Sequence, residues 1–349
     1  MKRILFIKLG AIGDVIQAAA AVDQLKLANS GVQVDWVVGQ SIAALLEKMA
    51  VADKVIPVPD QRLLAGSIFQ RMGALLACWM NIANKSQRYH AVYIAHTNWQ
   101  YDLLALPAYI FNPYLIFQKQ KRFFPALNEY RVCEYLKFLT GKTIGAKEST
   151  KILQKLGENL LANIQSQGSP FQKDSQKQSV VLIPGGSKNA LRDDFLRRWA
   201  IERYVELAQL LISQGYEVVL VGAFSDQWVK PYFEKLHVVD LIGKTSLLEL
   251  VEILDKAELI ITHDTGPLHL ATLTKTPLIT LFGPTPASAV APIGRENLKV
   301  FAASSEVACA PCYDGKNYAN CSNPICMKSI TVDDVFTASQ NLLKSKGLH

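Results

Sequence analysis

A polar sequence, His263-Asp264-Thr265-Gly266, directly follows a short apolar run at 259–261. The apolar run predicts a buried strand of a parallel sheet. Pro267 predicts the first turn of a helix, because an N–H at that position would have no partner there. The segment therefore predicts a strand, a tight loop and a helix N-terminus, where free N–H groups and the helix dipole attract anions. The alternative is that Asp264 or Thr265 only caps the helix.

The second half of the chain holds further residues suited to phosphate. Three loops that follow predicted strands supply small or polar groups: 184–188, 222–226 and 262–269. Lys188, Arg197 and Arg198 add cations nearby in sequence. An arginine side chain could bind a diphosphate with two hydrogen bonds and so stabilise a negatively charged leaving group. The alternative is that Arg197 and Arg198 face solvent.

In the first half, Asp14 stands where a glycine-containing loop, 9–13, enters a predicted helix. A carboxylate at this position is an N-cap, a general base, or both, since the two roles do not exclude each other. His96 ends a predicted strand at 89–96, and ligands of open α/β sheets bind outside the carboxyl ends of strands. His96 is therefore a candidate for contact with substrate, with a structural role as the alternative. The spacing of Gly10 and Gly13 differs from the dinucleotide-binding fingerprint.

The elements that position these residues alternate between strands and helices. Strands are predicted at 4–7, 32–38, 54–58, 89–96, 179–183, 217–222, 259–261 and 277–283, and helices include 15–28 and 41–49. This alternation predicts an α/β fold with doubly wound parallel sheets. A polar stretch at 165–178 predicts a linker. We therefore expect domains at 1–170 and 179–335 with a ligand cleft between them, and a last helix at 336–349.

The net charge of +7 and the pI near 9.0 favour anionic partners. No segment approaches about 18 uncharged apolar residues, so no membrane span is predicted. The apolar run at the N-terminus is too short for a signal peptide, and we expect a cytoplasmic protein. Residues 103–117 carry no charge and precede a basic, aromatic segment at 118–124. This region either docks on an anionic membrane surface or forms a buried helix pair followed by a solvated basic turn.

Four cysteines lie close together near the end of the chain: Cys309, Cys312, Cys321 and Cys326. Four thiolates could form a structural tetrahedral zinc or iron site, and the first pair has metal-ligand spacing. The spacing of the second pair fits a zinc ribbon poorly. Free thiols or labile disulfides are the alternative. Such a metal site would leave no open position for substrate.

Several motifs resemble those of glycosyltransferase family 9, the lipopolysaccharide heptosyltransferase family. They occur in the family's order over residues 4 to about 330, and together they form a specific signal: Leu9-Gly10-Ala11-Ile12-Gly13-Asp14-Val15, Pro184-Gly185-Gly186-Ser187-Lys188-Asn189, Leu196-Arg197-Arg198-Trp199, His263-Asp264-Thr265-Gly266-Pro267-Leu268-His269-Leu270-Ala271 and 276–285.

The resemblance implies a GT-B fold, in which two Rossmann-like domains with parallel sheets face each other across a cleft. It also implies that the last helix, 336–349, packs back on the first domain. It also implies an inverting transfer that requires no metal or other cofactor, with Asp14 as the general base. Arg197 stands where many relatives have lysine, and a guanidinium has a different geometry toward phosphate. The implied donor-binding residues are Gly185, Gly186, Ser187, Lys188, Arg197, Arg198, His263, Asp264, Thr265, Gly266 and His269. The implied acceptor-binding residues are Gly10, Ala11, Gly13 and His96.

The function implied by the resemblance is transfer of a heptose from ADP-heptose to a lipopolysaccharide inner-core acceptor at the cytoplasmic face of the inner membrane. Alternatives are a transferase for another nucleotide sugar or a nucleotide-sugar epimerase on the same fold. A non-enzymatic protein that binds metal or nucleic acid is a third class. The basic residues are scattered along the chain, which argues against nucleic acid as a partner.

Overall fold

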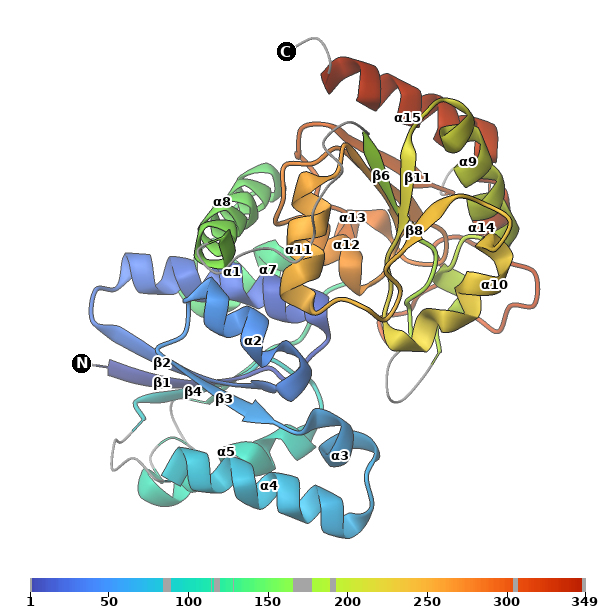
Figure 1. Cartoon of the computed structure of the whole chain (residues 1–349). Coiled ribbons are helices and arrows are strands. Elements are labelled where there is room, and N and C mark those ends of the chain that lie inside the picture. Colours follow the sequence, from blue (N-terminus) through green and yellow to red (C-terminus); the bar gives the residue numbers. More distant parts are fainter. Residues whose placement is uncertain are drawn as a thin grey trace. The chain divides into compact units, whose positions relative to one another are not determined.

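Alternating strands and helices form two parallel sheets in the computed structural model, which describes residues 2–83, 89–113, 115, 120–127, 129–165, 178–188, 193–303 and 307–346 (Figure 1). The chain divides into two units, each containing one sheet. Unit 1 comprises Met1–Ala126 and Arg131–Gly145, and unit 2 comprises Leu127–Tyr130 and Ala146–His349. The predicted α/β class with two parallel sheets is confirmed.

Unit 1 is built on a five-stranded parallel sheet in the order β3-β2-β1-β4-β5. The strands are β1 (Lys2–Ile7), β2 (Val32–Gly39), β3 (Lys54–Val58), β4 (Ala91–Ile94) and β5 (Gln120–Arg122). The central strand β1 is apolar and buried from Ile4 to Ile7, as expected for a strand with helices on both faces. Because β1 pairs with β4, the loops that follow these two strands lie at the same edge of the sheet.

Helices cover both faces of the unit 1 sheet. They are α1 (Ile12–Ala28), α2 (Gln40–Met49), α3 (Asp60–Ala65), α4 (Ile68–Ala83), α5 (Asp102–Phe111) and α7 (Arg131–Thr140). Helices α1 and α7 pack together on one face, and α4 packs beside α5 on the other (Figure 1). The basic segment, for which a solvated turn was one of two alternatives, contributes the edge strand β5 at 120–122, which pairs with β4. Residues 118 and 119 lie outside the described part of the chain.

Unit 2 is built on a six-stranded parallel sheet in the order β11-β10-β9-β6-β7-β8. The strands are β6 (Ser179–Ile183), β7 (Glu217–Leu220), β8 (Val238–Asp240), β9 (Leu259–His263), β10 (Leu278–Phe282) and β11 (Leu298–Ala302). The described helices are α8 (Ala146–Gln165), α9 (Ile201–Ser213), α10 (Lys230–Phe233), α11 (Leu247–Lys256), α12 (Gly266–Ala271), α13 (Ala287–Val290), α14 (Ile325–Lys328) and α15 (Val332–Lys346). Strands β6 and β9 are adjacent and fully buried, so their following loops meet.

Helix α8 belongs to unit 2, although the sequence predicted residues 146–170 as part of the first domain. Its apolar face packs within unit 2, where Gly157 lies so close to Leu273 that a Cβ would be 1.7 Å from the Leu273 carbonyl oxygen. The predicted linker, 165–178, is largely outside the described residues. Helix α15 packs against α9, β9 and β10 of unit 2. No helix in the described ranges is both long and apolar enough to cross a bilayer.

Candidate functional site

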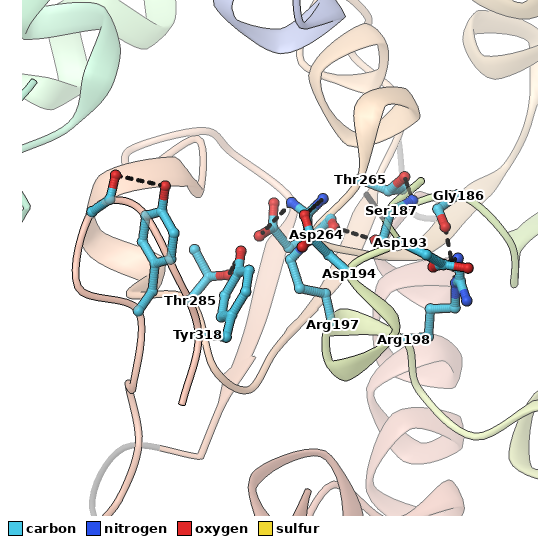
Figure 2. A network of polar contacts seen from close by, with 12 residues as sticks. Gly186, Ser187, Asp193, Asp194, Arg197, Arg198, Asp264, Thr265, Thr285 and Tyr318 are labelled. Carbon is cyan, nitrogen blue, oxygen red and sulfur yellow. Dashed lines mark hydrogen bonds and ion pairs between the residues drawn. The ribbon is translucent and has the colours of Figure 1, made fainter. Parts of the chain in front are cut away.

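Loops from the carboxyl ends of β6, β9 and β10 carry polar residues that meet in unit 2 (Figure 2). The loop after β7 joins them through Asp226, which accepts a hydrogen bond from the Gly186 N–H. Asp264 is at the centre of this cluster and is almost completely buried. Its Oδ2 accepts a hydrogen bond from Arg197, whose Nη1 lies 3.2 Å away, and Arg197 also pairs with Asp194 at 3.5 Å. The unit therefore holds one guanidinium between two carboxylates.

Asp264 is held in its charged form. Burial alone would raise its pKa, but the charge of Arg197, a hydrogen bond from Thr285 and the charge of His269 together lower it below the usual range. The two carboxylates of Asp264 and Asp194 in turn fix the position of Arg197, whose side chain is 20% exposed. Its Nε has no hydrogen-bond partner among the described residues. Arg197 thus has a spare donor, and an anionic ligand supplies the acceptor that such a group requires.

The glycine-rich loop after β6 is packed against its neighbours rather than left open. The Gly186 N–H donates to Asp226 Oδ1 at 2.9 Å, and the Ser187 N–H donates to Thr265 Oγ1 at 3.0 Å. A Cβ on Gly186 would lie 2.1 Å from Thr265 Oγ1, and Gly186 has a φ of +86°. A glycine is therefore required here by the fold itself. In this arrangement the Gly186 and Ser187 amides predicted to bind phosphate already have protein acceptors.

Thr265 occupies the N-cap position of α12, but its side chain makes no capping bond and accepts from Ser187 instead. The alternative that this residue serves mainly as a helix cap is therefore wrong. Asp264 likewise pairs with Arg197 and Thr285. Gly266 begins α12, and His269 lies within that helix near Asp264.

Arg198 faces away from the Asp264 cluster (Figure 2). Its Nε donates to the Gly186 carbonyl at 2.9 Å, its Nη2 pairs with Asp193, and its guanidinium lies over the Trp228 ring. The interpretation that Arg198 merely faces solvent is wrong, because the Arg198 side chain hydrogen bonds to the loop that carries Gly186. Lys188, also predicted to bind the donor, is exposed in the same loop.

His263 is the last residue of β9 and is fully buried. Its Nδ1 lies 3.1 Å from the Tyr204 hydroxyl of α9. Burial, with the charge of Arg197, lowers the pKa of His263 to about 3, so the imidazole is neutral at pH 7. The structure places this predicted donor-binding residue in the core beneath the loop.

His263 should make the protein sensitive to acid. In the unfolded chain a histidine is protonated below about pH 6.5, whereas folded His263 is not protonated until about pH 3. The contribution of His263 to the free energy of unfolding is therefore fully present above about pH 6.5, and it decreases as the pH falls below that value. We expect His263→Gln to reduce the stability difference between pH 7.5 and pH 5.0 by about 2 kcal/mol, measured by urea unfolding. A difference as large as that of the wild type would contradict this assignment.

Asp14 of unit 1 lies in the first turn of α1, whose N-cap is Ala11, so the N-cap alternative for Asp14 is wrong. The Asp14 side chain is 35% exposed, and its Oδ2 pairs with Lys8 Nζ at 2.9 Å. The Tyr135 hydroxyl donates to Asp14 Oδ1 at 3.4 Å. Burial and then the Asp14 charge raise the pKa of Tyr135 well above 10, so the phenol remains a neutral donor. The carboxylate is therefore oriented by two groups and still reaches solvent, as a general base requires.

His96 lies beside this carboxylate, just beyond the end of β4. Its ring stacks on Tyr101 with centroids 3.9 Å apart, and its Nδ1 accepts from the Asn98 N–H at 3.0 Å. Burial and the charge of Lys8 lower the pKa of His96 to about 4, so the imidazole is neutral at pH 7. The structure thus brings His96 and Asp14 together at the edge of the sheet where the paired strands β1 and β4 end.

The other residues predicted to contact the acceptor lie between β1 and α1. Gly10 is partly buried, Ala11 is exposed and Gly13 is buried. The Gly39 N–H donates to the Leu9 carbonyl at 2.8 Å, which fixes the beginning of this loop against β2. The exposed backbone at Ala11 adjoins the turn that carries Asp14.

The cysteine segment does not form a metal site in this arrangement. Cys309, Cys312, Cys321 and Cys326 are free thiols that line one pocket of about 230 Å³ together with Leu196 and Pro284. Within the described ranges, no group of three or more His, Cys, Asp or Glu side chains is arranged to hold a metal ion. The thiols are therefore not arranged as the predicted zinc or iron centre, and no disulfide joins them.

The same segment supplies a residue that the sequence did not identify. The Tyr318 hydroxyl lies 3.3 Å from Thr285 Oγ1 (Figure 2). Burial raises the pKa of Tyr318 to about 12, and the nearby charge of Arg197 opposes this shift. Asp226, Thr285 and Lys8 were also missed. A signal existed for Lys8, a single cation at the end of an apolar strand.

Comparison with known proteins shows which family this chain resembles. The family model of glycosyltransferase family 9 (heptosyltransferase) matches residues 117–321. Lipopolysaccharide heptosyltransferase 1 of Escherichia coli O18:K1:H7 is 24% identical over 88% of this chain and 93% of its own length. Lipooligosaccharide heptosyltransferase 2 of Haemophilus influenzae is 38% identical, but the match spans only 26% of this chain and 28% of that protein. An E. coli heptosyltransferase solved with ADP-2-deoxy-2-fluoro heptose has a TM-score of 0.66 and 19% identity, covering 97% of this chain and 99% of its own.

Proposed function

This chain belongs to glycosyltransferase family 9, and we propose that it transfers a heptose from ADP-heptose to a lipopolysaccharide inner-core acceptor. The observation that carries the proposal is the match to lipopolysaccharide heptosyltransferase 1 of E. coli over 88% of this chain. The E. coli heptosyltransferase that shares the fold was solved with an ADP-heptose analogue, which supports an ADP-linked donor.

Unit 2 is the proposed donor site. The donor diphosphate would contact Arg197, whose Nε is uncommitted and whose position is fixed by Asp264 and Asp194. A guanidinium fixed before the reaction stabilises the charge that develops on the leaving ADP without a cost of reorganisation. Lys188 and His269 flank the same loops and would contact the phosphate or the sugar. These loops are held in place by the buried His263, by the partly buried Arg198, and by Gly185, Gly186, Ser187, Thr265 and Gly266.

Unit 1 is the proposed acceptor site. Asp14 would remove the proton from the acceptor hydroxyl as that oxygen attacks the anomeric carbon, and the bond to the ADP oxygen would break with inversion. Lys8 and Tyr135 orient the carboxylate. His96 and the backbone at Gly10, Ala11 and Gly13 would contact the acceptor. We also propose that the protein acts in the cytoplasm at the surface of the inner membrane, where such an acceptor is presented.

The donor can be tested by isothermal calorimetry with ADP, UDP and GDP in buffer containing EDTA. We expect ADP to bind at least about tenfold more tightly than UDP or GDP, because base contacts of about 1.4 kcal/mol already give that ratio. Addition of Mg²⁺ in place of EDTA should change the ADP affinity by no more than about twofold, because Arg197 supplies the positive charge. Equal binding of all three nucleotides, or binding that requires Mg²⁺, would contradict the proposed donor site.

A further inference from the structure

Helix α4 exposes a large apolar surface. Only Ala74, Cys78 and Ile82 of this helix are buried, and they pack against the unit 1 core. The opposite side carries large apolar side chains that are mostly exposed: Ile68, Phe69, Met72, Leu76 and Met80. Phe69 is 86% exposed and Met80 is 66% exposed. Helix α4 is apolar on both sides and has a single charged residue. Exposing the second apolar side to water is unfavourable, and an exposed apolar patch of this kind marks an interaction surface.

The exposed surface continues onto the neighbouring helix. Helix α5 packs beside α4 (Figure 1), and the Trp79 Nε1–H of α4 donates to the Leu103 carbonyl of α5. Helix α5 exposes Leu103, Ile110 and Phe111. We refer to the exposed apolar residues of α4 and α5 as the α4/α5 face.

Positive charge is concentrated in the same part of the chain. The sequence from 61 to 126 contains seven lysines and arginines and a single acidic residue, Asp102, in a chain whose formal net charge is +7. The remainder of the chain is therefore close to neutral. Arg62 of α3 and Arg71 of α4 are both exposed next to the first turn of α4. An apolar surface with a cationic border is complementary to an anionic lipid bilayer.

The α4/α5 face also begins beside the proposed acceptor site. Helix α4 follows β3 and α3, and α5 follows β4 and the loop that carries His96, so both helices start at the sheet edge where Asp14 lies. Burial and then the Asp14 and Asp60 charges raise the pKa of Tyr101, which places these groups near one another. A surface at this edge would meet the membrane next to the site for the acceptor hydroxyl.

We propose that the α4/α5 face docks unit 1 on an anionic lipid bilayer, with apolar side chains in the headgroup region and Arg62 and Arg71 on the lipid phosphates. This docking would present a membrane-borne acceptor to Asp14, and that part rests on the proposed function. A second copy of this chain is a poorer partner, because it would bring two clusters of positive charge together.

The proposal can be tested by flotation of the full chain with vesicles of phosphatidylglycerol and phosphatidylethanolamine, and with vesicles of phosphatidylcholine alone. We expect binding to the anionic vesicles and much less binding to the neutral ones. The triple variant Phe69→Gln/Met72→Gln/Met80→Gln should bind the anionic vesicles at least about tenfold more weakly. In this variant, three apolar side chains are no longer available to move from water into the bilayer. Binding should also fall at high salt, which screens the lipid charge.

The matched control is Phe224→Gln in unit 2, where Phe224 is 74% exposed but lies outside the α4/α5 face. It should bind the vesicles within about twofold of the wild type. The proposal is overturned if the wild type does not float with anionic vesicles or if the triple variant floats equally well. Loss of self-association in the triple variant without loss of vesicle binding would assign the face to a second copy. Calorimetry with ADP on the same proteins separates the two proposals: ADP binding without vesicle binding overturns docking alone, and the reverse result overturns the transferase assignment.

Discussion

Asp14→Asn is expected to lower the rate of heptose transfer by about a thousandfold, within the range that general-base catalysis contributes. The amide is nearly the same size but cannot accept the proton of the acceptor hydroxyl. The side chain it replaces is partly exposed and is oriented by Lys8 and Tyr135, so the substitution leaves the fold of unit 1 in place. ADP binding, measured by calorimetry, should be unchanged because the proposed donor site is in unit 2.

The matched control is Asp23→Asn, which removes a carboxylate from the same helix without touching Lys8 or Tyr135. This variant should keep the wild-type rate within about twofold. Tyr135→Phe should lower the rate only severalfold, since the hydroxyl orients Asp14 over a long hydrogen bond of 3.4 Å. Substantial transfer by Asp14→Asn, at a tenth of the wild-type rate or more, would exclude Asp14 as the general base.

Arg197→Ala is expected to weaken ADP binding by about one hundredfold, because charge-assisted hydrogen bonds to phosphate contribute about 1.5–3 kcal/mol. Arg197→Lys should recover part of this loss, since an ammonium keeps the charge but lacks the planar pair of donors. The measurement is calorimetry with ADP. Lys244→Ala, which removes a surface lysine paired with Asp240, should bind ADP as the wild type does.

Removal of Arg197 also leaves Asp264 as a buried carboxylate without its ion-pair partner, which is expected to destabilise the protein by about 3 kcal/mol. Loss of ADP binding through instability must therefore be separated from loss of a direct contact. The double variant Arg197→Ala/Asp264→Asn removes the buried charge and should regain most of the thermal stability. If ADP binding returned with that stability, Arg197 would be a structural residue and the proposed donor site would be wrong.

Much of the fold could be predicted because buried parallel strands are apolar and lie between polar loops. The run 179–183 and the run 54–58 were predicted with their observed bounds. The unit to which α8 belongs could not be predicted, because its amphipathic pattern shows that one face is buried but not which unit buries it. The close approach of Gly157 to Leu273, more than a hundred residues away, determines that choice.

For the two candidate sites as well, the sequence predicted which loops meet but not the tertiary contacts of those loops. The convergence of loops after β6 and β9 follows from the order of strands, and the position of Asp14 beside His96 follows from the pairing of β1 with β4. The partners of the loops do not follow from sequence, because Asp226 and Thr265 are brought to the Gly186 loop only by tertiary structure. The family resemblance placed His263 among the donor-binding residues, in a loop predicted to follow the apolar run at 259–261. Strand β9 continues to His263, and Tyr204 of α9 provides its buried partner.

The most direct measurement is the product of a reaction containing the purified full chain, ADP-heptose and a lipopolysaccharide inner-core acceptor lacking that heptose. Mass spectrometry of the acceptor and NMR of the new glycosidic bond would report both transfer and stereochemistry. The proposed mechanism predicts addition of one heptose, release of ADP and inversion at the anomeric carbon, all abolished by Asp14→Asn. An unchanged acceptor would contradict the assigned substrates, and a product with retained configuration would contradict direct attack assisted by Asp14.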